Sequence, residues 1–487
     1  MTERTESESV TAPAGTDSGS TTRRVPLIAV AALLVLLTNA IVFVLPPLLP
    51  AIQAEYQLTS VSSVTWIFTL LTLGGGAGFV LIPRLSDVIG DRDTAVLSGA
   101  ALTGGALVAA IGDSYAALLV GAVAMGFGTA AQMLPLGFLR RSLGESGLTT
   151  AVAVLVVATG IGIVVGMIGG GLIVENLSLR AFLYILAAAC AATTVASFLT
   201  IEQFRPTTAV AGIGAVGTVW MIAWVGAVLL ALSQGVVWGT EALIPLAAGL
   251  LGAGAWFWAQ RRSSSPVFSA ALIKSPFVTA TCVAVGLFAT VNAAFLVLLS
   301  NYAQIDPASL APEDAYGLGR TALQTGWLMV PFAITFLVGG TVVEKPVAEG
   351  RGAAVLITGA VITAVGLALL AVAHDQQWHY LVGAGVIGFG CAMGYAGSFA
   401  IVQMAVPESE AGMAAAMAGT AMSVGFALGS AIVTSVLSAS TVPIPGTDIA
   451  VANRDQYDTG YWAAVGLAAL IVVTVAISRT RSGRRTP

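Results

Sequence analysis

Charged residues are scarce in this sequence. Its 487 residues include 24 acidic and 20 basic side chains, which is 9% of the chain, whereas 57% of the residues are hydrophobic. The mean hydropathy is +0.92. Such a chain cannot fold as one soluble globule, because it has too few polar residues to cover a surface exposed to water. The composition therefore indicates an integral membrane protein.

Cysteine and histidine are also rare. The three cysteines, Cys190, Cys282 and Cys391, are odd in number and lie within apolar runs, which argues against a disulfide framework. The two histidines, His374 and His379, have no cluster of Cys or carboxylates at zinc-ligand spacing. Catalytic side chains are not gathered at one depth either. We expect no metal, no cofactor, no enzymatic activity and no nucleic-acid partner.

Long apolar runs make up most of what is present. They lie between residues 27 and 478, and each is bounded by charges or turn residues. A run of roughly 20 residues is the length that a helix needs to cross the hydrocarbon core of a bilayer. Short alternating segments typical of a barrel are absent. We predict an all-α integral membrane protein with about 14 transmembrane helices.

The distribution of basic residues orients these spans. Of the 20 Lys and Arg residues, all but Arg180, Arg320 and Arg454 fall on one face of the predicted map. Cytoplasmic loops carry the excess of basic residues, so we expect both termini in the cytoplasm and a multi-pass protein of the plasma (inner) membrane. Residues 1–24 are predicted to be a disordered cytoplasmic tail and residues 479–487 a second tail.

A charged segment from Pro83 to Asp93 separates the second and third apolar runs, and we expect a short loop there. Four of its residues match the pattern between the second and third spans of the major facilitator superfamily: Leu85, Asp87, Gly90 and Arg92. The sequence thus resembles that family of transporters. Pro83 and Asp91 depart from the pattern, since the family has a Gly and a basic residue at these positions.

Further segments are similar to the 14-span drug:proton antiporter branch of that family. They include Val44-Leu45-Pro46 followed by Trp66, a glycine ladder in the fifth span, and residues 406–412 and 419–431. The resemblance implies two pseudo-symmetric six-helix bundles at 25–205 and 276–478. A two-helix insert is expected at 206–260 and a cytoplasmic linker at 261–275. The motif Gly340-x-x-x-Glu344-Lys345 echoes the charged loop in the second half, as an internal repeat predicts.

The glycine ladder and the charged loop have structural interpretations. The ladder, Gly162, Gly166, Gly170 and Gly171, predicts a close helix contact between the two halves. The resemblance also predicts a cytoplasmic latch that holds the outward-facing state, with Asp87 facing the start of the helix near Gly412. The other latch candidates are Gly90, Arg92, Arg140 and Arg141.

No charged residue lies in the middle of a predicted span, although proton relays in transporters usually place one there. Two positions that the family associates with coupling are apolar here, Leu37 and Ala122. The remaining candidates for proton coupling are Glu55, Asp113 and Glu241 at outer span ends. The alternative for each is a solvated loop charge.

A substrate path without buried charges requires neutral polar and aromatic groups. Residues three or four apart share a face of a helix, and this spacing predicts a cavity lined by Asn39, Phe43, Trp66, Gln132, Asn292, Phe295, Tyr395, Phe399 and Gln403. The alternative for the amides is hydrogen bonding between neighbouring helices. Such a lining suits an apolar or aromatic solute, because a strongly charged solute requires fixed opposite charge.

The leading hypothesis is a secondary transporter that exports a small hydrophobic compound or drug by alternating access, a type of protein that can confer multidrug and antibiotic resistance. The resemblance implies proton antiport. An uncoupled facilitator or importer of the same fold is the alternative, and an intramembrane enzyme or a sensor is less well supported. We expect the partners to be the solute, the lipid bilayer and protons, and the protein to be a monomer.

Overall fold

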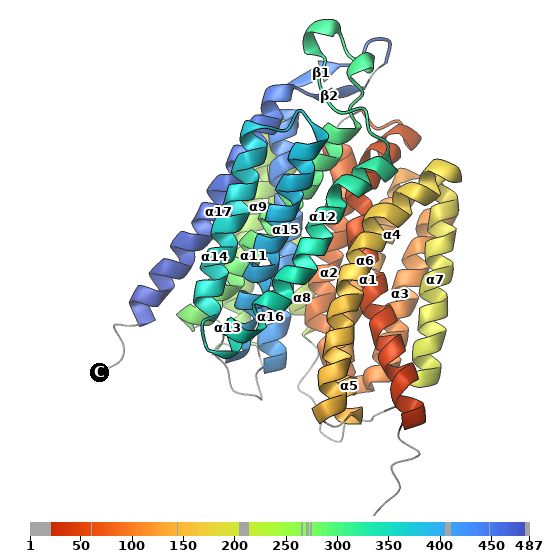
Figure 1. Ribbon diagram of the computed structural model, residues 1–487, viewed down its shortest axis with the longest axis vertical. Helices are drawn as coiled ribbons and strands as arrows, with labels where there is room; N and C mark the ends of the chain where they lie inside the picture. The colour runs from red at the N-terminus through yellow and green to blue at the C-terminus, as the bar shows by residue number, and fades with distance from the viewer. Residues whose placement is uncertain are drawn as a thin grey trace, which may run out of the picture.

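The structure is a computed structural model that describes residues 21–59, 61–143, 145–203, 214–263, 266–268, 272, 275–404, 411–447 and 449–482. It is a bundle of long helices (Figure 1). The first half of the chain forms α1 (Thr21–Glu55), α2 (Val61–Ile89), α3 (Asp91–Ile111), α4 (Tyr115–Thr129), the 3-10 helix η1 (Ala130–Met133), α5 (Leu134–Ser142), α6 (Glu145–Asn176) and α7 (Leu179–Thr200). The predicted all-α fold is confirmed.

The insert consists of α8 (Ala215–Trp238), the 3-10 helix η2 (Gly239–Ala242) and α9 (Leu243–Gln260). The second half forms α11 (Pro276–Gln304), η3 (Pro307–Ser309), η4 (Pro312–Asp314), α12 (Ala322–Val342), α13 (Glu344–Ala348), α14 (Gly352–Val372), α15 (Gln377–Met404), α16 (Ala411–Ser438), β1 (Thr441–Pro443), β2 (Ala450–Ala452) and α17 (Arg454–Ser482). We call the face where α1 begins and α17 ends the terminal face, and the opposite face, with strands β1 and β2, the hairpin face (Figure 1).

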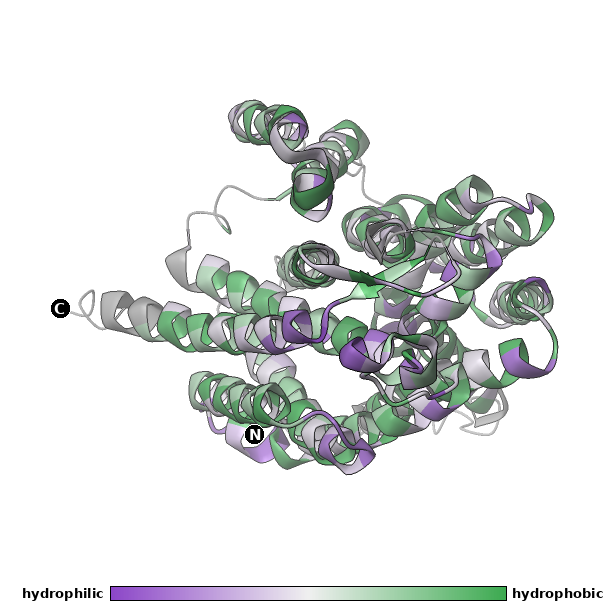
Figure 2. Cartoon of the chain, turned by 90° about the horizontal axis from the view of Figure 1, so that it is seen from above, coloured by the Kyte–Doolittle hydropathy of each residue, from purple (hydrophilic) through white to green (hydrophobic). Residues whose placement is uncertain are grey.

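The described residues contain 13 segments long and apolar enough to cross a membrane, and one of them spans the whole insert. That segment folds back on itself, because Gly239 adopts a φ of 56° and α8 and α9 then pack side by side. The Trp256 indole donates a hydrogen bond of 2.7 Å to the Gly217 carbonyl across the pair. The insert therefore crosses twice, which agrees with the prediction of about 14 spans. Figure 2 shows hydrophobic residues along the helices and hydrophilic ones mainly at helix ends and connections.

The two halves lie next to each other and meet along two helix pairs. One pair is α2 with α16 and the other is α6 with α12 (Figure 1). Glycines allow close approach at these contacts: a Cβ on Gly326 of α12 would lie 2.1 Å from the Met167 carbonyl oxygen of α6. Helix α8 packs against both α2 and α16, so the insert covers one seam between the halves.

One local prediction was wrong. The segment Pro83–Asp93 is not a loop, because α2 continues through Pro83 to Ile89 and only Gly90, with a φ of 92°, separates it from α3. Two further features were not predicted. The 3-10 helix η1 interrupts the membrane span Tyr115–Ser142, and Val442 and Val451 face each other in an antiparallel hairpin.

Candidate substrate cavity between the two halves

A cavity of about 210 Å³ lies between the two halves. Six predicted residues line it, from α1, η1, α11 and α15: Asn39, Phe43, Gln132, Asn292, Tyr395 and Phe399. Trp66 and Phe295 are not among the lining residues. Phe295 is fully buried and stacks on Phe332 with 5.8 Å between ring centroids, so it is part of the hydrophobic core. The side chain of Gln403 lies outside the described residues.

Other lining residues were not predicted. The hydroxyl groups are Thr72, Thr129, Thr159 and Ser423, and the additional aromatic rings are Phe79, Phe336 and Phe426. Small hydroxyl residues occur throughout the apolar runs of this sequence, so their presence alone does not mark a cavity. The aromatic residues of α12 and α16 occur at the same helical spacing as residues of the hydrophobic core. Only the packing of the two halves shows that they line a cavity.

The 3-10 helix η1 determines how Gln132 reaches the cavity. A 3-10 helix has three residues per turn, whereas an α-helix has 3.6. It therefore changes the direction of the side chains that follow it. The Thr129 hydroxyl donates to the Gly126 carbonyl at 2.6 Å, and Pro135 has no N–H to continue the regular ladder. Thr129 and Gln132 both face the cavity as a result.

The cavity contains no charged side chain, since none of its lining residues is Asp, Glu, Lys, Arg or His. Several polar lining groups are bonded within their own helices. Asn39 Nδ2 donates to the Val35 carbonyl at 2.8 Å, and the Thr72 hydroxyl donates to the Phe68 carbonyl at 2.8 Å. Asn292 Oδ1 and Tyr395 Oη, in contrast, are buried without a hydrogen-bond partner of good geometry among the described residues.

The halves are bonded directly to each other between the cavity and the hairpin face. Ser300 donates to the Pro46 carbonyl and Gln304 Nε2 donates to the Pro47 carbonyl at 2.9 Å, which joins α11 to α1. Three further contacts join α2 to α16 and α6 to α12: Thr65 with Thr434 at 2.6 Å, Thr69 with Ser430 at 3.4 Å, and the Leu323 N–H with Glu175 at 2.8 Å. The cavity is therefore closed on this side.

The other side of the cavity adjoins a second cavity of about 300 Å³ near the terminal face. Met133 lines both cavities. The second cavity is polar at its far end, where Asp87, Asp91 and Arg141 line it. The arrangement thus places an uncharged cavity at the centre, a second cavity toward the terminal face, and direct contacts between the halves toward the hairpin face.

Comparison with known proteins assigns the family. The family model of the Major Facilitator Superfamily matches residues 29–304 and 281–487, which together cover nearly the whole chain. The chain belongs to the Major Facilitator Superfamily. This confirms the family predicted from the sequence motifs and with it a multi-pass membrane protein.

Named resistance proteins of this superfamily are similar to the chain. It is 24% identical to the multidrug resistance protein Stp of Mycobacterium tuberculosis over 406 residues. The matched residues are 80% of this chain and 72% of that protein. It is 25% identical to the tetracenomycin C resistance and export protein of Streptomyces glaucescens, over 85% of this chain and 75% of that one. It is 26% identical to the puromycin resistance protein pur8 of Streptomyces alboniger, over 93% of this chain and 89% of that protein.

Solved structures support the superfamily fold. The human organic anion transporter MFSD10 matches with a TM-score of 0.61 and 14% identity, over 93% of this chain and 99% of that one. A mutant form of the nucleoside transporter NupG matches with a TM-score of 0.63 and 14% identity, over the same shares. At this identity the likeness concerns the fold alone.

The charged motif of the superfamily lies at the terminal face. Arg141 forms an ion pair with Asp91, which stands where the superfamily pattern has a basic residue, and Ser86 also donates to this carboxylate. The Asp87 side chain makes no hydrogen bond or ion pair with a described residue, and neither does that of Arg140. Arg141 therefore does not complete a pair with Asp87 in this conformation.

The remaining basic residues of the motif bind local partners. Arg84 Nη2 donates to the Pro266 carbonyl at 2.7 Å and to that of Val267 at 2.6 Å, which ties α2 to the linker after α9. The Arg92 guanidinium lies beside Asp93 at 3.5 Å and over the Phe198 ring at 5.0 Å from its centroid. The predicted latch to the start of α16 stays a prediction, because the side chains of residues 403–412 lie outside the described part of the chain.

The glycine ladder joins other helices than predicted. Gly162, Gly166 and Gly170 of α6 pack against α1, within the first half, and a Cβ on Gly166 would lie 2.6 Å from the Ala40 carbonyl oxygen. Only Gly171 makes the predicted contact between the halves, where a Cβ would lie 2.6 Å from the Leu323 nitrogen of α12. The interpretation of the whole ladder as a contact between halves was wrong.

The three candidates for proton coupling lie away from the cavity. All three are exposed at the hairpin face: Glu55 ends α1, Asp113 lies between α3 and α4, and Glu241 lies in η2. Asp113 forms an ion pair with Arg180. None of them lines either cavity between the halves.

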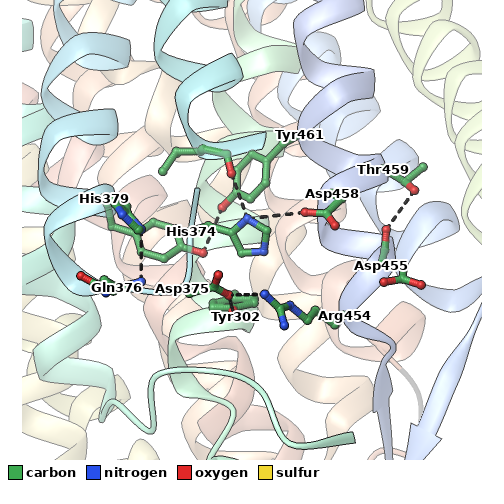
Figure 3. A network of polar contacts seen from close by, with 12 residues as sticks. Tyr302, His374, Asp375, Gln376, His379, Arg454, Asp455, Asp458, Thr459 and Tyr461 are labelled. Carbon is green, nitrogen blue, oxygen red and sulfur yellow. Dashed lines mark hydrogen bonds and ion pairs between the residues drawn. The ribbon is translucent and has the colours of Figure 1, made fainter. Parts of the chain in front are cut away.

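A polar network that the sequence did not predict joins α11 and α17 to the connection between α14 and α15 at the hairpin face (Figure 3). Asp375 accepts hydrogen bonds from the Tyr302 hydroxyl at 3.0 Å and from Arg454 Nη2 at 2.7 Å. His374 is buried: its Nδ1 lies 2.9 Å from the Leu370 carbonyl oxygen and 3.6 Å from Asp458 Oδ1. The network connects helices of the second half only.

Proposed function

We propose that the protein exports a small hydrophobic compound or drug by alternating access of its two halves. The observation that carries this proposal is the uncharged cavity between the halves, which direct hydrogen bonds between the halves close toward the hairpin face. An apolar, aromatic wall with a few amides and hydroxyls is the chemistry that binds such compounds. The names of the relatives, which concern multidrug, tetracenomycin C and puromycin resistance, support the same class of solute.

The proposed orientation places the terminal face in the cytoplasm. Basic residues support it, because Arg84, Arg92, Arg140 and Arg141 all lie toward that face, and cytoplasmic segments carry the excess of Lys and Arg. In this orientation the structure corresponds to a conformation that is closed to the outside. The latch at Asp87 would then act in the opposite, outward-facing conformation.

Proton antiport is the proposed energy source, with Glu55, Asp113 and Glu241 as its candidate carboxylates. Uncoupled facilitation, or import by the same fold, is the second candidate function. One observation favours it: no ionisable carboxylate or histidine lines the cavity, so substrate and proton do not share a site there.

Uptake into inside-out membrane vesicles separates these functions. A panel of hydrophobic dyes and antibiotics is offered with an imposed pH gradient, and again after an uncoupler, with vesicles that lack the protein as the control. Accumulation that depends on the gradient supports proton-coupled export. Equilibration that ignores the uncoupler supports the facilitator. Uptake no greater than that of the control vesicles for every compound contradicts both.

A further inference from the structure

Two polar side chains of the second half differ from the rest of the cavity wall. Asn292 of α11 is 1% exposed and Tyr395 of α15 is 8% exposed, and both line the cavity. The two side chains are neighbours, yet neither Asn292 Oδ1 nor Tyr395 Oη has a hydrogen-bond partner of good geometry among the described residues. Buried polar atoms in native proteins are nearly always paired, so an unpaired pair in a binding cavity indicates where a ligand group would be placed.

Most other polar side chains of the wall differ from this pair in bonding or in burial. The amide nitrogen of Asn39 is bonded to Val35, and the hydroxyls of Thr72, Thr129 and Thr159 each donate to a carbonyl of their own helix. The Gln132 amide also lines the cavity, but that side chain is only partly buried. Asn292 and Tyr395 are therefore the buried polar groups that this wall presents to a solute.

The surroundings of the pair are aromatic. The Tyr395 ring lies 6.0 Å from that of Phe288 and 6.1 Å from that of Phe336, between centroids. Phe43 of the first half packs edge-on against Phe426 of the second half, with 6.5 Å between ring centroids. A flat aromatic solute can contact such rings by stacked or edge-to-face packing.

The absence of charged side chains is the third property by which the cavity wall selects among solutes. A permanently cationic solute loses its hydration on entering the cavity, and no carboxylate of the wall compensates for that loss. We propose that Asn292 and Tyr395 form a hydrogen-bonding subsite that selects uncharged aromatic compounds carrying a hydroxyl or N–H group, and that the cavity discriminates against permanent cations. The inference rests on the proposed export function and identifies its substrate class.

Binding of three matched compounds to the purified full-length protein in nanodiscs tests the subsite. The probes are 2-hydroxyanthraquinone, 2-methoxyanthraquinone and the same ring carrying a trimethylammonium group, at a mildly acidic pH that keeps the hydroxyl compound neutral. Loss of one hydrogen bond inside a binding site typically weakens affinity by roughly tenfold. We expect the hydroxyl compound to bind roughly tenfold more tightly than the methoxy compound, and the cation to bind least well.

Variants assign the discrimination to the two residues. Asn292→Leu and Tyr395→Phe should each reduce the preference for the hydroxyl compound while the methoxy compound still binds. Asn301→Leu is the matched control on the same helix: Asn301 donates to the Val297 carbonyl at 2.9 Å and lies outside the cavity, so the preference should persist. Asn292→Asp, assayed with the cation at neutral or higher pH because burial favours the protonated carboxyl group, should make the cation a ligand.

The outcomes distinguish this inference from the proposed function. Equal affinity for the hydroxyl and methoxy compounds in the unmodified protein, or a preference that survives both substitutions, overturns the inference. Failure of all three compounds to bind overturns it as well. Transport of both neutral compounds at equal rates in vesicles leaves export standing without the subsite. Selective binding without any vesicle uptake leaves the subsite standing and contradicts export.

Discussion

Arg141 binds Asp91, its neighbour across the end of α5 and the beginning of α3, and leaves Asp87 without an ion pair among the described residues. The Asp91 carboxylate is only 4% exposed, while the Arg141 side chain is 45% exposed. Asp91 also occupies the first turn of α3, where the positive end of the helix dipole favours a negative charge. The pair holds the first half together at the terminal face, and the latch residue remains available for another conformation.

Replacing Arg141 should destabilise the first half. Arg141→Gln leaves the buried Asp91 carboxylate with Ser86 and the helix dipole, at an expected cost of about 1 to 3 kcal/mol, reduced from that of a fully buried pair because Arg141 is partly exposed. Arg140→Gln is the control, since that exposed side chain has no partner among the described residues. Thermal unfolding of the purified variants in detergent measures the difference. Equal midpoints for the two variants would show that the pair contributes nothing.

Asp87→Asn should impair transport without lowering the stability of this conformation. The Asp87 carboxylate makes no hydrogen bond or ion pair with the described residues here, so its charge is expected to be needed when the terminal face closes. The measurement is the initial rate of vesicle transport, normalised to the amount of folded protein in the membrane. A normal transport rate in vesicles containing Asp87→Asn would contradict the proposed role of Asp87 as a latch.

The effect of a Gly→Ala substitution on stability should depend strongly on its position along α6. Gly166→Ala should destabilise the protein, because the new Cβ would lie 2.6 Å from the Ala40 carbonyl oxygen and force α6 away from α1. Gly169→Ala, on the same helix, should be tolerated, since its Cβ would meet only Val165 Cγ1 at 3.8 Å. Yield and thermal stability in detergent report both effects. Similar losses for the two variants would contradict the packing described here.

The network at the hairpin face predicts a stabilising role for Asp375. Asp375→Ala removes the acceptor of both Tyr302 and Arg454, and we expect a loss of about 1 to 2 kcal/mol, since both bonds lie near the surface. Asp455→Ala is the control, because that exposed carboxylate makes no side-chain hydrogen bond with a described residue. Thermal unfolding compares the two. An unchanged midpoint in Asp375→Ala would mean that solvent replaces the network without cost.

Local spacing in the sequence predicted six of the 19 residues that line the cavity, because residues three or four apart on one helix share a face. Asn39 with Phe43, and Tyr395 with Phe399, were found in this way. Spacing does not say which neighbour the face meets, and for this reason Phe295 was assigned to the cavity although it packs on Phe332. The ladder of α6 was assigned to the wrong neighbouring helix for the same reason.

Contacts between segments that lie far apart in the chain could not be predicted from the sequence. Asp91 and Arg141 lie 50 positions apart, and Tyr302 and Asp375 lie 73 apart, so no local pattern joins them. Helix α2 continues through Pro83 because a proline can be accommodated inside a long helix when neighbouring helices hold it. The charges around it nevertheless predicted a loop.

A reversible cross-link at the hairpin face tests alternating access most directly. The Thr65 and Thr434 hydroxyl oxygens lie 2.6 Å apart, on α2 and α16 of opposite halves. The double variant Thr65→Cys, Thr434→Cys should form a disulfide on mild oxidation that holds this face closed, with each single variant as a control. Vesicle transport should be lost on oxidation and return with a reductant. Full transport by the quantitatively cross-linked protein would contradict alternating access between these two halves.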